Sequence, residues 1–509
     1  MSDFYRELKP YMNKLSELNV WDSLFVIRQY CLKSFPNYKI ETPNFSNIEH
    51  PFRCNIPVYF ADFLISASLK FSSTCKSQKS LRQFSTRLQL LKKFDDVYNR
   101  ANQEQYEDIL IWLKTYLLNQ FKMQHFQLFS DRLYKYYYLY SAPKISEHVK
   151  RVIGVTIEQY ITIIALLYFE FSRNFGYEFD KLVGHLVYDG KRFSKSDFIF
   201  VVENLIATIQ DVKKNIRIDY SNKLFLCHNN ATHVVTPIFR DNDMVYCPFP
   251  TYILNSGIDG LQYRLNLKNS ENKGLNDEVA LRFEDYIGQQ LEYYANAGKT
   301  FQYIREQVYN KGQNKTSDWI VYDNECLLFI DCKLKKLTID AILETKLDRV
   351  KFDSTIDSIK FGNRKSVEQL ISMQDSPLVK DILEIGIDLG KILCCCEDWK
   401  NGKIPSLPPF TKNYQIKAIV LTLEETFCGH FIIKEMVDKV AFKYVLDKKK
   451  SFPQNVKTSI ISSSTFDNSI PLISKYGIYN HVFEDNFEYK EGKNESNEFL
   501  SMKFDEFFE

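Results

Sequence analysis

The stretch SDWIVYDNECLLFIDCKLKK, residues 317–336, combines two apolar runs with charged residues at their ends. The run CLLFI is followed directly by Asp331, Cys332 and Lys333, and the run WIVY comes directly after Asp318. Two such runs on either side of a short polar break predict a β-hairpin. One charge at the end of a strand is common, but three charges in these positions need a reason.

The expected register of this hairpin places two carboxylates against each other. If Asn324 and Glu325 form a two-residue turn, Asp318 lies directly opposite Asp331, with Cβ atoms about 5 Å apart on one face of the sheet. Lys333, two residues along the strand, shares that face. The two carboxylates repel each other, and a divalent cation such as Mg²⁺ would turn this repulsion into coordination. A register shifted by one residue would separate the two acids.

A third carboxylate is expected from the helix that precedes the hairpin. In NDEVALRFEDYIGQQLEYY, residues 276–294, apolar residues at helical spacing form a stripe that would be buried. Glu284 lies on the flank of this stripe. From the flank, its side chain can reach the edge of a sheet that packs against the helix.

The overall composition is that of an ordinary globular protein, with 45% hydrophobic and 26% charged residues. The formal net charge of +2 excludes a strongly basic protein that binds nucleic acid non-specifically, so a polyanion has to be bound by local patches. The 11 cysteines contain no C-x-x-C pair, which indicates reduced thiols and a cytoplasmic location. The longest apolar run, residues 161–169, is too short to span a bilayer, and no membrane partner is expected.

The pattern changes along the chain from helical to mixed. Up to about residue 216 apolar residues recur at helical spacing, and after a polar stretch around residues 268–276 helix, hairpin, helix and strand follow one another. We therefore expect an α+β protein: a mostly helical domain over residues 1–265 with an accessory, regulatory or recognition role, and an α/β domain over residues 266–509. The turn-rich stretch near 375–414 resembles an insertion into the second domain.

The order RFEDYIG, SDWIV, FIDCK and VEQL resembles the core of the PD-(D/E)XK nuclease superfamily. The resemblance covers roughly residues 276–423. It implies a restriction-endonuclease-like mixed sheet flanked by helices, and an endonuclease that uses Mg²⁺ or Mn²⁺ to hydrolyse phosphodiester bonds. Two features depart from the family pattern: no proline precedes Asp318, and the triplet begins with Asp in place of the more frequent Glu. Both departures keep the type of metal ligand.

The resemblance also implies roles for individual residues. Lys333 would orient the attacking water and stabilise the charge of the transition state, and Gln369, in a following helix, would position the water or a phosphate. The implied metal ligands are Glu284, Asp318, Asp331 and the backbone carbonyl of Cys332. The basic residues expected to contact phosphates of the nucleic acid are Lys335, Lys336, Arg364 and Lys365.

DNA is expected over RNA as the substrate because no RNA-recognition motif is present in the sequence, and a role as an effector of bacterial anti-phage defence is inferred by analogy. Because cutting both strands of a duplex usually takes two active sites, a homodimer is an expected assembly, and a protein of the same defence system is a further candidate partner. Two functional alternatives stay open. The same residues would serve an effector that cleaves RNA such as tRNA, and an inactive nuclease fold would only bind nucleic acid or protein. A surface hairpin with ordinary charges is the structural alternative.

Overall fold

The computed structural model of the chain describes residues 19–25, 28, 65–66, 68–70, 72, 129–189, 193–216, 235–265, 272–335, 366–410, 414–424, 431–451, 455–484, 486–487 and 496–508. These residues form helices and mixed β-sheets, so the chain is α+β overall, as the sequence predicts. The chain divides into two compact units. The first comprises Met1–Met123 and Tyr140–Leu275, and the second comprises Gln124–Leu139 and Asn276–Glu509.

The first unit is mainly helical and contains a small sheet with the strand order β1-β4-β3-β2. Its helix α9 (Ile157–Arg173) begins with a capping box, in which the Thr156 hydroxyl accepts the backbone N–H of Gln159 and the Gln159 side chain accepts that of Thr156. The other described elements of this unit are α8 (Pro143–Ile153), β1 (Gly176–Glu178), α10 (Phe179–Asp189), α11 (Lys195–Glu203), β2 (Ile206–Thr208), α12 (Ile209–Asn215), β3 (Ile238–Asp241), β4 (Met244–Tyr246), α15 (Thr251–Leu254), the π-helix η3 (Asn255–Asp259) and α16 (Leu261–Arg264).

Among the described residues, no single helix is long and apolar enough to cross a bilayer. Helices α8 and α9 meet the criteria of length and composition only as a pair, and the pair is bent by 58° at the break between them.

The second unit is built around a mixed sheet. In the part of the chain that the structure describes, this sheet has five strands in the order β11-β10-β9-β8-β5. Strands β9, β10 and β11 are parallel, whereas β8 pairs antiparallel with both β9 and β5. The elements are α17 (Lys273–Gly298), β5 (Gln302–Arg305), β6 (Val308–Tyr309), β7 (Asn314–Lys315), β8 (Trp319–Tyr322), β9 (Cys326–Lys333), α20 (Ser366–Ile371), α21 (Pro377–Lys400), β10 (Gln415–Thr422), α22 (Phe431–Asp447), β11 (Val456–Ser462), α23 (Ser463–Tyr476), the π-helix η6 (Tyr479–Glu484) and α24 (Glu498–Phe508).

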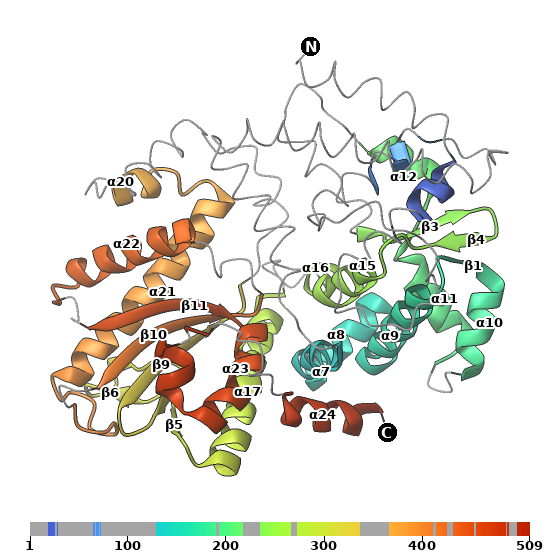
Figure 1. Cartoon of the computed structure of the whole chain (residues 1–509). Helices are drawn as coiled ribbons and strands as arrows, with labels where there is room; N and C mark the ends of the chain where they lie inside the picture. Colours follow the sequence, from blue (N-terminus) through green and yellow to red (C-terminus); the bar gives the residue numbers. More distant parts are fainter. Residues whose placement is uncertain are drawn as a thin grey trace, which may run out of the picture. The chain divides into compact units, whose positions relative to one another are not determined.

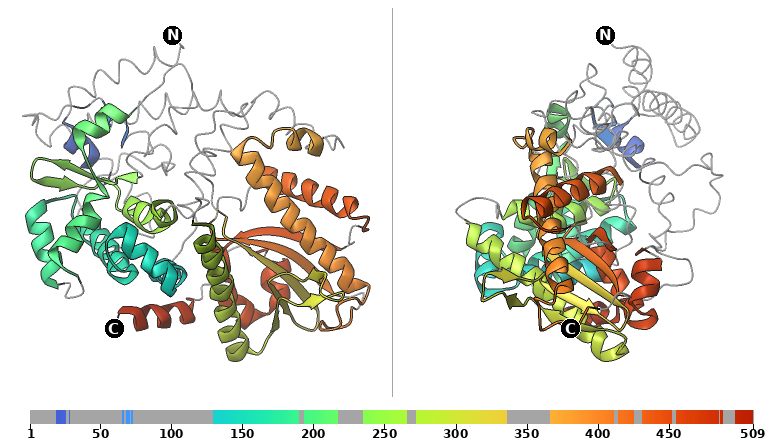
Figure 2. Two further views of the ribbon diagram at one scale, coloured as in Figure 1. Left: turned by 180° about the vertical axis from the view of Figure 1, so that it is seen from behind. Right: turned by 90° about the vertical axis from the view of Figure 1, so that its left-hand side faces the viewer.

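Helices α21 and α22 are the crossover connections between the parallel strands, and they lie side by side (Figure 1). Gly386 and Gly390 of α21 face Val440 and Tyr444 of α22, and a Cβ atom at either glycine would overlap these side chains. Within the stretch 375–414, which we expected to be an insertion, Pro377–Lys400 therefore form the crossover helix α21, which packs on β9 and β10. In the left view of Figure 2, α21 lies in front of the sheet.

Helix α17 packs against the opposite face of the sheet. Trp319 of β8 pairs directly with Ile330 of β9, so their side chains share one face. The Trp319 ring packs against Gly288 of α17, where a Cβ atom would overlap it. Phe329 points to the other face, where its ring contacts Trp399 of α21. The site described below therefore lies between two helices that cover different faces of β9.

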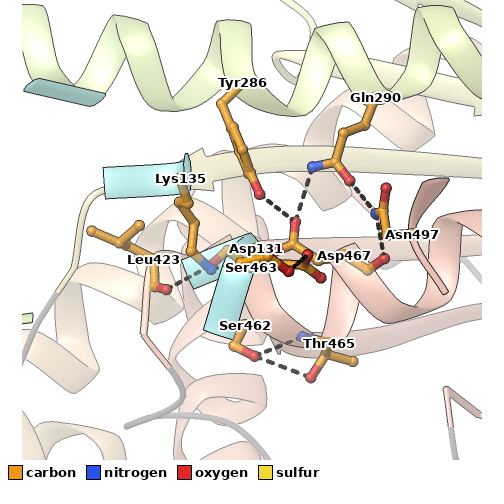
Figure 3. A network of polar contacts seen from close by, with 11 residues as sticks. Asp131, Lys135, Tyr286, Gln290, Leu423, Ser462, Ser463, Thr465, Asp467 and Asn497 are labelled. Atoms are coloured by element: carbon orange, nitrogen blue, oxygen red, sulfur yellow. Dashed lines mark hydrogen bonds and ion pairs between the residues drawn. The ribbon is translucent and has the colours of Figure 1, made fainter. Parts of the chain in front are cut away.

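A buried polar network ties helix α7 (Phe129–Tyr140) into the second unit (Figure 3). Lys135 of α7 forms an ion pair with Asp467 of α23 at 3.1 Å and donates a hydrogen bond to the Ser463 hydroxyl at 2.7 Å. Asp467 also accepts hydrogen bonds from Tyr286 at 3.0 Å and Gln290 at 2.9 Å, both on α17. A buried ion pair is stable only when its remaining hydrogen-bonding capacity is satisfied, and the two α17 side chains satisfy it here.

Helix α7 also contacts α17 directly. The Arg282 guanidinium donates two hydrogen bonds to the Tyr138 carbonyl, at 3.1 and 2.7 Å, and lies 3.7 Å from the centroid of the Tyr138 ring. Gln289 donates a hydrogen bond to the Tyr138 hydroxyl at 2.7 Å. These contacts explain why Gln124–Leu139, which the sequence led us to place in the N-terminal domain, belongs to the second unit.

We expect Lys135→Met to lower the free energy of unfolding of the second unit by about 3–5 kcal/mol, because Asp467 would remain as a buried charge without its partner. The double variant Lys135→Met/Asp467→Asn should recover part of this loss, since the Asp467 side chain is then neutral, although buried Asp131 still lacks the lysine charge. Urea denaturation of the full chain measures both effects.

The control is Lys503→Met, which removes the exposed ion pair with Glu506 in the same unit. It should change the free energy of unfolding by less than about 1 kcal/mol. A Lys135→Met variant as stable as the wild type would show that the buried pair does not stabilise the second unit.

Candidate functional site

The β8–β9 hairpin has the register that the sequence predicts, with Trp319 paired to Ile330. The turn is closed by the Asp323 carboxylate, which accepts the backbone N–H groups of Glu325 at 2.8 Å and Cys326 at 2.7 Å. An aspartate that bonds its own backbone in this way can stabilise a turn that lacks glycine. This explains how Asn-Glu serves in a position where Asn-Gly is the usual sequence.

Asp318 lies one residue beyond the last paired position of β8, where the same register places it opposite Asp331. Its carbonyl accepts the backbone N–H of Glu306 at 2.8 Å. Its carboxylate accepts the backbone N–H of Cys332 at 2.6 Å. The side chain of Asp318 thus satisfies a backbone donor of β9 at the point where the strand pairing ends, and this bond holds Asp318 next to the charged triplet.

Asp331 and Lys333 lie at the end of β9 and form an ion pair, with 2.6 Å between the Lys333 Nζ and an Asp331 carboxylate oxygen. Asp331 and Lys333 follow Phe329 by two and by four residues on the strand, and the Phe329 ring contacts α21. Because alternate side chains of a strand share a face, Asp331 and Lys333 lie on the α21 side of the sheet.

Glu284 is brought to the same place by one contact between helix and strand. The Trp319 indole N–H donates a hydrogen bond to the Glu284 carbonyl at 3.1 Å. Since Trp319 directly follows Asp318, this bond places the Glu284 side chain near the hairpin acids. Glu284 interacts electrostatically with Asp318, Asp331 and Lys333.

Burial and mutual repulsion raise the pKa values of the three acids. Burial, together with the charge on Glu284, raises the pKa of Asp318 to about 6, although the hydrogen bond from the Cys332 N–H opposes the shift. Burial raises the pKa of Asp331 to about 7 against the opposing effect of Lys333. The pKa of Glu284 is also raised, mainly by burial. Three acids therefore share the site with one lysine, and their pKa values rise because burial disfavours the charged forms and the acids repel one another.

The donor set fits a hard divalent cation, although the described residues contain no group of three His, Cys, Asp or Glu side chains placed to hold a metal ion. Mg²⁺ commonly takes only one or two carboxylates from a protein and fills its other positions with water and substrate phosphates. Asp318 and Asp331 supply that pair, and their pKa values are raised mainly by burial, with repulsion from neighbouring carboxylates adding to the shift. The Cys332 carbonyl and Glu284 are the further oxygen donors at this end of β9.

The other predicted site residues are placed differently. Gln369 lies on α20, which packs against α21 and α22, and its side-chain oxygen is buried without a hydrogen-bond partner among the described residues. No hydrogen bond in that part of the structure links it to the acids of the site. Lys335 forms an ion pair with Glu384 of α21 and lies 3.7 Å from Asp381 on the same helix. The other predicted phosphate contacts lie outside the described residues: Lys336, Arg364 and Lys365.

Asp388 of α21 is a carboxylate that the sequence analysis did not single out. It interacts electrostatically with both Asp331 and Lys333. It was missed because the supposed insertion was not expected to cover the sheet. The signal that could have revealed it is a stripe of acids at helical spacing, Asp381, Glu384 and Asp388, in a helix between two parallel strands.

Comparison with known proteins identifies no relative: no family model, no curated protein and no solved structure matches the chain. The chemistry of the site residues is therefore the basis for assigning a function.

We expect Asp318→Asn to change how stability depends on pH. Because folding raises the pKa of Asp318 from 3.8 to about 6, the stability that this group contributes is fully present below about pH 4 and is lost as the pH rises through about 6. Asparagine keeps an acceptor for the Cys332 N–H but carries no charge. The variant should therefore match the wild type near about pH 4 and be more stable by about 1–3 kcal/mol near about pH 8. Denaturation at both pH values measures this.

Comparing Asp318→Ala with Asp318→Asn separates the effect of the hydrogen bond from that of the charge, since alanine removes both and asparagine removes only the charge. It should be less stable than Asp318→Asn by about 1–3 kcal/mol at either pH, because the buried Cys332 N–H loses its acceptor. If the difference between the wild type and Asp318→Asn did not vary with pH, repulsion at Asp318 would not be the origin of the effect.

Proposed function

We propose that the chain is a Mg²⁺-dependent nuclease that hydrolyses phosphodiester bonds of DNA. The observation that carries this proposal is the gathering of Glu284, Asp318 and Asp331 beside Lys333 at the end of β9. Carboxylates with surplus negative charge suit the binding of a divalent cation, and an adjacent lysine suits the charge that develops on a phosphate during hydrolysis.

The order of these groups along the chain supports the same function. An acid on a helix, an aspartate at the start of a hairpin strand and a D-x-K triplet at the end of the next strand follow one another as in the PD-(D/E)XK nucleases that the sequence resembles. The hairpin is continued by a parallel strand, β10, after the crossover helix α21. A restriction-endonuclease-like fold for the second unit is part of this proposal.

Each residue would have a defined part in the reaction. Asp318, Asp331 and the Cys332 carbonyl would hold the cation, with Glu284 as a further ligand, directly or through water. When bound, Mg²⁺ polarises the scissile phosphate and lowers the pKa of a coordinated water. Lys333 would orient the attacking water and stabilise the extra negative charge of the pentavalent transition state. The bond from water oxygen to phosphorus forms as the bond to the leaving oxygen breaks, which yields a phosphomonoester and a hydroxyl.

The first unit contributes none of these residues, so recognition or control of the nuclease is the role proposed for it. A nuclease joined to a large additional unit suits an effector of anti-phage defence, a proposal made by analogy. A homodimer would place two sites on one duplex.

We expect the purified chain to cut DNA in the presence of Mg²⁺ or Mn²⁺ and to stop when EDTA is added. Asp331→Ala and Lys333→Met should each lower the rate by a factor of about 10² or more, because each removes a group that acts on the reacting phosphate or its cation. Linear, supercoiled and single-stranded DNA and total RNA are incubated side by side. The products are then resolved on gels.

A matched pair of variants on α17 tests the helix acid. Glu284→Gln should lower the rate of cleavage, whereas Glu292→Gln, an exposed glutamate on the same helix, should not change it. If the chain cleaved RNA and no DNA, RNA would be the substrate in place of DNA. Cleavage that persists in Asp331→Ala and Lys333→Met would place the active site elsewhere, and the absence of both cleavage and metal binding would exclude a metal-dependent nuclease.

A further inference from the structure

Two contacts align α21 with β9 and thereby fix the place of Asp388. Beyond the end of the strand, Lys335 pairs with Glu384 of α21. Inside the strand, the Phe329 ring contacts Trp399, with 6.1 Å between the ring centroids. The helix and the strand thus run in opposite directions past each other. Asp388 lies between the two contacts on the helix, as the charged triplet does on the strand.

The lysine of the triplet interacts with two carboxylates that belong to different elements. Asp331 and Lys333 point to the α21 side of the sheet, and their Nζ–carboxylate distance is 2.6 Å. Asp388 interacts with the same ammonium from the helix. Its carboxylate also pairs at 2.8 Å with Lys391, whose side chain is 59% exposed. Because solvent can take over the hydration of an exposed lysine, Asp388 can give up this second partner at little cost.

The ion pair between Asp331 and Lys333 conflicts with the binding of a cation. A divalent ion on Asp331 competes with the ammonium for the same carboxylate and repels it. Lys333 nevertheless has to stay charged and close to the phosphate if it is to act there. A largely buried ammonium without a partner is unfavourable, so the lysine needs another carboxylate within reach.

We propose that Lys333 moves from Asp331 to Asp388 when a divalent cation binds, so that Asp388 is a positioning residue of the site. This inference rests on the proposed function, since it assumes that Asp331 is a metal ligand. Asp388 then does two things: it frees Asp331 for the cation, and it keeps the lysine ammonium charged beside the reacting phosphate.

The test measures Mn²⁺ binding to the full chain, without nucleic acid, by isothermal titration and by the loss of the free Mn²⁺ signal in electron paramagnetic resonance. The chains compared are the wild type, Asp388→Asn, Asp388→Glu, Lys333→Met and the double variant Lys333→Met/Asp388→Asn. Glu384→Gln is the matched control, because it removes a carboxylate one turn away on the same helix that pairs with Lys335.

Asp388→Asn should bind Mn²⁺ about tenfold more weakly than the wild type, the factor that corresponds to one lost hydrogen bond to a charged group. Asp388→Glu should restore most of the affinity, and Glu384→Gln should leave it unchanged. Without the lysine there is nothing to reposition. The double variant should therefore bind Mn²⁺ within about twofold of Lys333→Met alone, the agreement found for residues that do not interact.

Two results would overturn the proposal. Unchanged Mn²⁺ affinity in Asp388→Asn would show that the lysine does not need this partner. An equal loss of affinity in the Lys333→Met background would make Asp388 a ligand of the ion and not a support for the lysine. Cleavage assays on the same samples keep the two proposals distinct. A wild type that binds Mn²⁺ but cuts no nucleic acid would refute the nuclease while the binding data still decide the role of Asp388, and a wild type that binds no Mn²⁺ would refute both.

Discussion

The register of the β8–β9 hairpin is the constraint on which the rest of the site depends. A slip by one residue would turn Asp331 and Lys333 to the face covered by α17 and away from α21. Three contacts prevent such a slip: the buried pair of Trp319 and Ile330, the turn closed by the Asp323 carboxylate, and the bond from the Cys332 N–H to Asp318. In the last of these contacts Asp318, a candidate catalytic residue, also stabilises the sheet.

The same register creates an unfavourable concentration of charge that the surrounding structure has to hold in place. Glu284, Asp318 and Asp331 repel one another, and burial strengthens the effect. Helix α17 cannot move away because Trp319 is bonded to its backbone and packs against Gly288. Crossover helix α21 is held by its close packing on α22. A divalent cation at this proposed site would relieve the repulsion without a rearrangement of the fold.

The sequence revealed the local features of the site, because each depends on residues near one another in the chain. Two apolar runs on either side of a short polar break predicted the hairpin, the turn set its register, and the helical stripe placed Glu284. The sequence did not reveal α21 as a crossover helix. Its pattern shows that one face is buried but not which element covers that face. Asp388 was missed for this reason, and the place of Gln369 could not be judged.

Charged residues in the core are harder still to recognise from sequence. Lys135 and Asp467 are ordinary residues for a protein surface, and nothing in their local pattern distinguishes them from solvated charges. They are nevertheless almost completely buried, with exposed fractions of 1% and 0%. Only the three-dimensional arrangement shows that they are partners, because 332 residues separate them in the chain.

The chain passes from the second unit to the first at the C-terminal end of α7. The segment Tyr140–Leu275 of the first unit stands in the sequence between α7 and the part of α17 that carries Glu284. Both of these helices are held together in the second unit by Lys135, Arg282 and the residues that they contact. The second unit cannot complete its core until Asp467 has been synthesised, since its partner Lys135 lies 332 residues earlier in the chain. The segment Tyr140–Leu275 is thus joined at its two ends to two helices that pack against each other in the second unit.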